Sequence, residues 1–143
     1  MPLTTFTAAA ATCEIDPGTE VSDDAGMLQI SDRVFTDLVA SEEPRIAGTN
    51  KPALKITLNP VTGEGTLEGT FVLTPDAVKG TWEGELNGRF VQGMVKSSGI
   101  ARGTGELQGS VLQVSFQQIS EYPGEAPCDD PKAFFDMAGW ILD

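Results

Sequence analysis

The side chains that could do chemistry in this chain are few, and histidine is not among them. The 143 residues include nine Lys and Arg, twenty-one Asp and Glu, two cysteines and no histidine. Histidine is the commonest general base near neutral pH and the commonest metal ligand. A Ser-His-Asp or Cys-His arrangement is therefore excluded, as is a zinc site of cysteine and histidine. We expect no metal and no cofactor, and any catalysis must use carboxylates, Tyr122, lysine, ordered water or the shape of a cavity.

Polar residues on otherwise apolar strand faces are the candidates for a site. Asp136 shares a face with Trp140, and if that face points into the protein, burial would raise the pKa of Asp136 and suit it to act as a general acid or base. If the alternate face with Phe135 and Met137 points inward, Asp136 lies in water. Which face is inside depends on strand register.

Other candidates would bind a ligand without reacting. Gln118 continues an apolar face, where it could orient a ligand by a hydrogen bond or reach solvent at the strand end. Arg33 could neutralise a ligand carboxylate or form a surface ion pair with a neighbouring acid. Large aromatic side chains could line a pocket or fill a plain core. These are Phe71, Trp82, Phe90, Phe116 and Trp140.

The stretch SSGIARGTGELQGS (97–110) is rich in glycine, and glycine clusters can bind phosphate. A dinucleotide fingerprint requires G-x-G-x-x-G opening a helix, whereas here the spacing differs and a β-branched, aromatic segment follows. No Gly-Lys-Ser/Thr triplet is present for a P-loop. We therefore interpret these glycines as places where strands bend.

Apolar and polar residues alternate along most of the chain, as half-buried strands require. The clearest segments are LKITLNP (54–60), GTLEGTFVLTP (65–75), KGTWEGEL (79–86) and SVLQVSFQQIS (110–120). GMLQISDRVFTDLVAS (26–41) predicts a long strand broken near Ser31-Asp32, and KAFFDMAGWILD (132–143) favours a strand over a short helix. Asn87-Gly88 predicts the turn of a hairpin.

Antiparallel strands, short turns and no good amphipathic helix predict an all-β fold. The glycine density between residues 63 and 109 indicates strongly curved strands, and closing the sheet would remove its exposed edges. We expect one domain over 1–143, a single closed antiparallel β-barrel of about eight strands, with a partly irregular segment over 1–24 and the barrel over 25–142.

The two cysteines, Cys13 and Cys128, lie near opposite ends of the chain. A disulfide between them would close a loop of about 115 residues and add roughly 4–5 kcal/mol of stability by loop entropy. Two reduced thiols, typical of an intracellular protein, are the alternative. The alanine-rich start lacks a basic region and makes a poor signal peptide. The compartment stays undetermined, with the cytoplasm slightly favoured.

The run SSGIARGTGELQGSVLQVSFQQI (97–119) resembles the glycine-rich strand pair of allene oxide cyclase and dirigent-type barrels. PKAFFDMAGWILD (131–143) looks like their closing aromatic strand, and the resemblance covers about residues 25–142. It implies an eight-stranded barrel with an apolar cavity. In the plant cyclases that cavity folds an unsaturated fatty-acid epoxide for ring closure, with the help of a carboxylate and a held water.

Three functions follow as expectations. The first is binding of a small apolar or amphipathic molecule in the barrel. The second is a cofactor-independent isomerase or cyclase that confines its substrate and uses a carboxylate. The third is a packed barrel with an assembly or interaction role, and a homodimer or trimer is a further expectation. A net charge of −12 argues against nucleic-acid binding and against anionic membrane surfaces.

Overall fold

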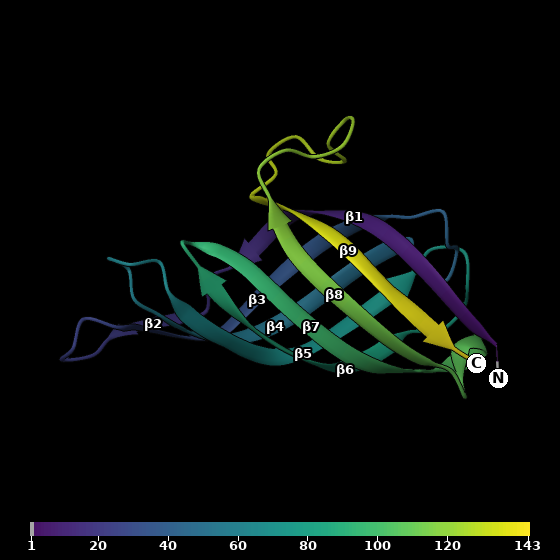
Figure 1. Cartoon of the computed structure of the whole chain (residues 1–143), viewed down its shortest axis with the longest axis horizontal. Helices are drawn as coiled ribbons and strands as arrows, with labels where there is room; N and C mark the ends of the chain where they lie inside the picture. The colour runs from purple at the N-terminus through teal and green to yellow at the C-terminus, as the bar shows by residue number, and fades with distance from the viewer. Residues whose placement is uncertain (1) are drawn as a thin grey trace.

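The strands pair in chain order around a closed antiparallel barrel, shown in Figure 1 for a computed structural model that describes residues 2–143. Eight strands run in the order β1-β9-β8-β7-β6-β5-β4-β3, and β1 pairs with β3 to close the ring. A ninth strand, β2, pairs with β3 alone. The predicted fold class is confirmed. The elements are β1 (Leu3–Asp16), β2 (Thr19–Ser22), β3 (Leu28–Ala40), β4 (Gly48–Leu58), β5 (Gly65–Pro75), β6 (Trp82–Val91), β7 (Met94–Gly103), the 3₁₀ helix η1 (Gly105–Leu107), β8 (Val111–Ile119) and β9 (Ala133–Leu142).

The alternation that predicted the strands also sorts side chains between the interior and the outer face. In β4, Leu54 and Ile56 are buried while Lys55 is exposed. In β5, Leu67 and Phe71 are likewise buried. These two strands therefore give every second residue to the barrel interior, as a closed barrel requires.

The long strand near residue 30 is interrupted where the sequence predicted a break. The pairing of β3 with β4 shifts between Ile30 and Arg33, and Asp32 has a φ of 56°. A bulge of this kind changes the phase of alternation. After the bulge, β3 presents Arg33, Phe35 and then Asp37 to the interior.

The predicted hairpin turn at Asn87-Gly88 is wrong, because both residues lie inside β6. Gly88 pairs with Ser97, and a Cβ on Gly88 would lie 2.2 Å from the Lys96 carbonyl oxygen. This glycine thus permits close strand contact. The chain turns at Gln92 and Gly93, whose φ angles of 52° and 79° suit a two-residue hairpin.

The expected irregular segment over 1–24 also needs correction. Leu3–Asp16 forms β1, which pairs with β9 along ten residues and with β3, so it closes the barrel. Its centre is the run Ala8–Ala11, which lacks the bulky alternating side chains that identify a strand. The barrel therefore begins well before residue 25.

The glycine-rich stretch 97–110 forms the end of β7, the corner with η1 and the approach to β8. Gly105 and Gly109 have φ angles of 58° and 93°, which few other residues adopt. The interpretation of this stretch as a place where the strands bend is consistent with these φ angles.

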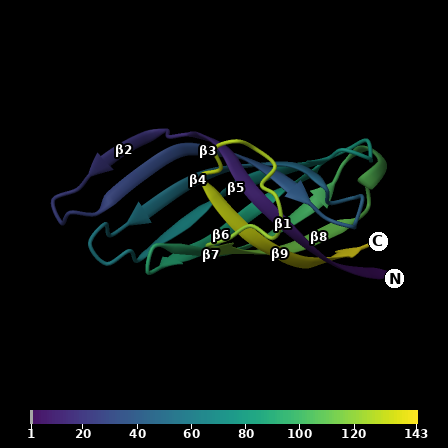
Figure 2. The same ribbon diagram turned by 90° about the horizontal axis from the view of Figure 1, so that it is seen from above.

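The two ends of the barrel differ in construction. Near the chain termini, at the right of Figure 1, η1 and the β3–β4 and β5–β6 connections cover the end. At the other end, the β2–β3, β4–β5 and β6–β7 hairpins extend outward, as Figure 2 shows from above. We call these the filled end and the hollow end.

Candidate ligand cavity

A cavity of about 220 Å³ occupies the hollow end of the barrel interior. Its wall is mainly apolar and receives side chains from β1 and from β3 to β9. The apolar part consists of Ile15, Phe35, Pro52, Leu54, Ile56, Leu67, Leu86, Phe90, Val95, Phe116, Ala133 and Phe135. Residues far apart in the sequence thus form one concave surface, partly open to solvent, as is typical of small-molecule sites.

One buried polar cluster interrupts this apolar wall. Thr12 from β1, Asp37 from β3 and Asn50 from β4 all line the cavity and are 2%, 5% and 1% exposed. The Thr12 hydroxyl donates to Asp37 Oδ1 at 2.6 Å, and Asn50 Nδ2 makes a long contact of 3.5 Å to Asp37 Oδ2. Among the described residues, Asn50 Oδ1 has no hydrogen-bond partner.

Burial raises the pKa of Asp37 from 3.8 to about 6. The low polarity of the surroundings penalises the charged carboxylate, and the hydrogen bonds from Thr12 and Asn50 offset this only in part. A buried carboxyl group that titrates near neutral pH inside a cavity is a typical candidate for proton transfer.

Four of the candidates from the sequence meet at this cavity, and Phe90 in its apolar wall is one of them. Arg33, Phe116 and Gln118 all line it. Arg33 is committed to other groups, because its Nη2 lies 2.8 Å from a Glu20 carboxylate oxygen and its Nε donates to the Pro17 carbonyl. Gln118 accepts a hydrogen bond from the backbone N–H of Val95 through Oε1 at 3.0 Å.

Two further candidates are buried but do not line the cavity. Phe71 packs edge-on against Phe116, with ring centroids 6.2 Å apart. Trp82 is fully buried at the filled end, where its indole N–H donates to the Arg45 carbonyl at 2.8 Å. Both are therefore core residues in this structure.

Asp136 and Trp140 lie on the outer face of β9, so they do not contribute to the interior. Register is the reason: Met137 pairs with Phe116 and Ile141 with Leu112, which places Met137 and Ile141 inside. Asp136 is exposed. The hypothesis of a buried acid at Asp136 must therefore be corrected, and the buried carboxyl group is Asp37.

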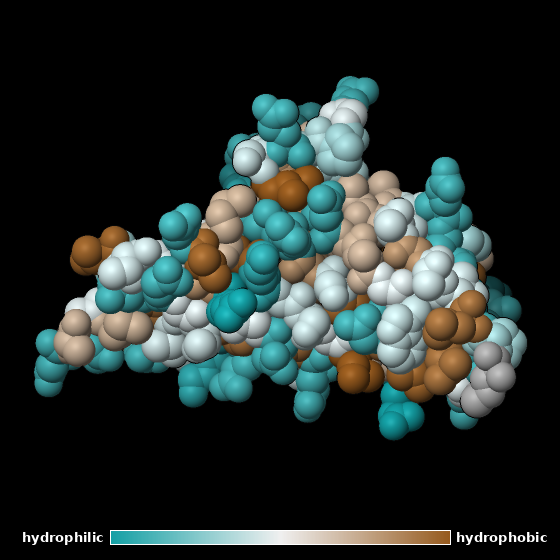
Figure 3. Space-filling model, in the orientation of Figure 1, coloured by the Kyte–Doolittle hydropathy of each residue, from teal (hydrophilic) through white to brown (hydrophobic). Residues whose placement is uncertain are grey.

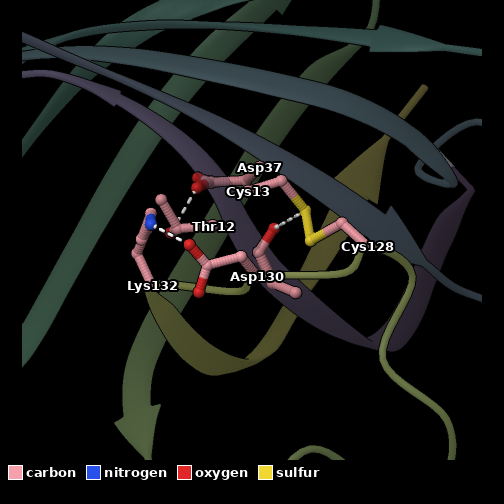
Figure 4. Close-up of a disulfide and its surroundings, with 7 residues drawn as sticks. Thr12, Cys13, Asp37, Cys128, Asp130 and Lys132 are labelled. Carbon is pink, nitrogen blue, oxygen red and sulfur yellow. Dashed lines mark hydrogen bonds and ion pairs between the residues drawn. A yellow bond between two sulfur atoms is a disulfide. The ribbon is translucent and has the colours of Figure 1, made fainter.

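The structure joins Cys13 to Cys128 by a disulfide, with no free cysteine in residues 2–143. Figure 4 shows that the bridge lies beside Thr12 and Asp37. It fastens the long β8–β9 connection to β1, next to a register shift between Thr12 and Glu14. The disulfide thus supports the strand that delivers Thr12 to the cavity.

Sequence reasoning missed Asp37 and Asn50, although a signal was present. Asn50 is in phase with Leu54 and Ile56, and it precedes the segment 54–60 in which the alternation is clearest. Asp37 is in phase with Phe35 and Val39, but the bulge at Asp32 breaks the alternation before it. Extending each pattern across its irregular residue would have found both.

The described residues offer little for a metal ion. Across residues 2–143, no group of three or more Asp, Glu, Cys or His side chains is arranged to hold one. Nor does this part of the chain contain a helix with the length and apolar character needed to cross a membrane.

The outer surface in Figure 3 is mostly hydrophilic, with hydrophobic atoms in several separate groups. Exposed apolar residues include Leu3, Val21, Val61 and Ile100. In this view no single broad apolar face is visible. The dimer or trimer suggested by the sequence stays a prediction.

No family model matches the chain, and no curated protein matches it. The closed eight-stranded barrel therefore rests on the structure itself.

Proposed function

We propose that this protein binds one small, mainly apolar molecule in the hollow end of its barrel. The cavity of about 220 Å³ carries the proposal, since protein interiors are otherwise packed as densely as organic crystals. An apolar ligand that binds against this wall would remove its own apolar surface and that of the wall from water, which favours binding. The sequence resemblance to allene oxide cyclase and dirigent-type barrels supports the same function.

The size of the cavity limits the ligand. An engineered apolar cavity of about 150 Å³ accommodates benzene. A cavity of about 220 Å³ therefore fits a ring with a short alkyl chain, and a long-chain lipid would extend beyond it. We expect a ligand of that smaller class.

Isothermal titration with propylcyclohexane tests this function. Val95 lines the cavity, so Val95→Phe should fill part of it and weaken binding at least tenfold. Val72→Phe is the matched control, because Val72 is exposed on the outer face of β5. Absence of binding to the wild-type protein, or equal loss in both variants, would refute the proposal.

A second candidate function is a cofactor-independent isomerase or cyclase, which Asp37 specifically favours. In such a reaction the Asp37 carboxylate would take a proton from carbon next to a carbonyl, leaving an enolate, and the resulting acid would return a proton. The same carboxyl group would thus act as base and then acid. Confinement in the cavity would add the orientation that the reaction needs.

Hydrogen–deuterium exchange into 4-propylcyclohexanone tests the second candidate. We expect the wild-type protein in D₂O to accelerate exchange next to the carbonyl, as measured by NMR. Asp37→Asn should bind the ketone and lose the acceleration. If the two proteins exchange the ketone equally, Asp37 is not a base and binding alone remains.

A further inference from the structure

The polar cluster at the cavity has more hydrogen-bond acceptors than donors. The Thr12 hydroxyl is its first donor and is used on Asp37 Oδ1. The Asn50 amide group supplies two further N–H donors, and its side-chain contact within the cluster is a long one to Asp37 Oδ2. Asn50 Oδ1 is buried and accepts no hydrogen bond from the described residues. A buried acceptor without a donor is costly, so the cluster lacks a donor.

The number of unused acceptors indicates the kind of donor. An ammonium group brings three N–H donors and a charge into a wall that is otherwise mainly apolar. A hydroxyl group brings a single O–H donor and no charge. Asn50 Oδ1 is the one atom of the cluster without a hydrogen-bond partner, and a single O–H donor satisfies it without bringing a charge against the apolar wall.

On the basis of the binding function proposed above, we infer that the ligand is a small neutral alcohol. Its hydroxyl group donates its one proton to Asn50 Oδ1, beside Asp37. Its hydrocarbon body lies against the apolar wall, which includes Leu54, Leu67 and Leu86. The polar cluster therefore selects the ligand by its donor, and the apolar wall selects it by size.

Three probes with the same hydrocarbon body test this inference by titration calorimetry. They are trans-4-propylcyclohexanol, its methyl ether, which keeps the oxygen but lacks the donor, and propylcyclohexane. We expect the alcohol to bind about tenfold more tightly than either of the others, the usual scale of one hydrogen bond. The corresponding amine should bind more weakly than the alcohol.

Other outcomes separate this inference from the function on which it rests. If the alcohol, ether and alkane bind equally, the cluster keeps its own water and the inference is overturned, while apolar binding stands. If the amine binds best, the hydroxyl assignment is wrong. If none of the probes binds, both the inference and the proposed function fail.

Variants locate the preference at the cluster. Asp37→Leu/Asn50→Leu replaces polar groups by apolar ones of similar size. This variant should still bind the alkane, and its affinity for the alcohol should be about equal to its affinity for the alkane. Asn50→Leu alone provides the same test if the double variant does not fold, with a preference reduced at least threefold. Thr74→Leu, on the exposed face of β5, is the control and should keep the full preference. A preference that survives in Asn50→Leu would overturn the assignment.

Discussion

The filled end and the hollow end of the barrel use the same alternation of side chains and reach opposite results. At the filled end, large residues occupy the interior, with Trp82, Ile46, Leu73, Leu112 and Ile141 almost fully buried. At the hollow end, the inward side chains leave a cavity that contains a buried carboxyl group. One sheet therefore supplies both a conventional core and a candidate binding site.

The ends are also fastened differently. At the filled end, the Arg45 guanidinium contacts Glu43 and Asp143, and Ser110 donates to Asp143 at 2.6 Å. The pKa of the Glu43 carboxyl is lowered mainly by its hydrogen bond from Arg45, and the pKa of Asp143 by its bonds from Ser110 and then Arg45. The hollow end has the disulfide beside its polar cluster. A covalent link thus stabilises the end where packing is incomplete.

Removing the disulfide should have the largest effect. Cys13→Ser/Cys128→Ser opens a link between residues 115 positions apart, and loop entropy predicts a loss of roughly 4–5 kcal/mol in the free energy of unfolding. Urea unfolding followed by tryptophan fluorescence measures it. A loss below about 1 kcal/mol would show that the hollow end does not depend on this link.

Truncating one aromatic residue at each end tests the difference in packing. Trp82→Ala should cost about 4 kcal/mol, since it leaves a void in a filled core. Phe135→Ala should cost about half as much, because Phe135 already faces the cavity. Urea unfolding followed by circular dichroism compares them, with Trp82→Phe as a milder control. Equal losses would contradict the distinction between the two ends.

The pH dependence of stability tests the buried carboxyl group. The pKa of Asp37 is raised from 3.8 to about 6 on folding, so the folded protein holds its proton more tightly and loses stability as pH rises from about 4 to 7. A shift of this size corresponds to about 3 kcal/mol. Asp37→Asn should remove this loss, so its stability relative to wild type should increase over that range.

Urea unfolding at several pH values measures this difference between the two proteins. Glu43 and Asp143, whose folded pKa values are lowered, contribute in the opposite direction, with stability lost as pH falls. Their contributions cancel in the comparison because both proteins contain them. A difference between wild type and Asp37→Asn that is constant with pH would contradict the burial of an ionisable group at the cavity.

The smallest expected effect comes from adding volume at each end. Val95→Phe places a ring where space exists and should change the free energy of unfolding by less than about 1 kcal/mol. Val114→Phe places the same ring in a packed core and should cost about 1–3 kcal/mol. Thermal unfolding of the two variants gives the comparison. Equal destabilisation would mean that the hollow end is not open to occupation.

Much of the fold could be predicted from the sequence, because alternation is a local property. The alternation predicts that Leu54 and Ile56 share one face of their strand, and both are buried, as is Leu67 in the next strand. The alanine run of β1 carries no alternation of size and so does not identify a strand. Asn87-Gly88 predicts a turn, but glycine is also required where two strands approach closely, as at Gly88. Local patterns thus predict that a strand is present better than they predict where it begins and ends.

The candidate site was harder to predict because it depends on register and on bulges. Asp136 and Asp37 both interrupt apolar segments, and only strand pairing determines which carboxyl group is inside. Thr12, Asp37 and Asn50 come from three strands and meet through cross-strand pairs, including Thr12 with Asp37 and Asp37 with Asn50. The pairing of Thr12 with Asp37 exists only because β1 closes on β3, and no local pattern in the sequence indicates that closure.

The most direct test of the binding proposal is a methyl NMR titration with trans-4-propylcyclohexanol. In protein labelled at isoleucine, leucine and valine methyl groups, resonances from Leu54, Leu67, Leu86 and Val95 at the cavity should shift and saturate. Those from Leu112 and Ile141 at the filled end should stay nearly unchanged. Saturable shifts confined to the hollow end would support a ligand cavity there. Shifts at neither end, or equally at both, would contradict it.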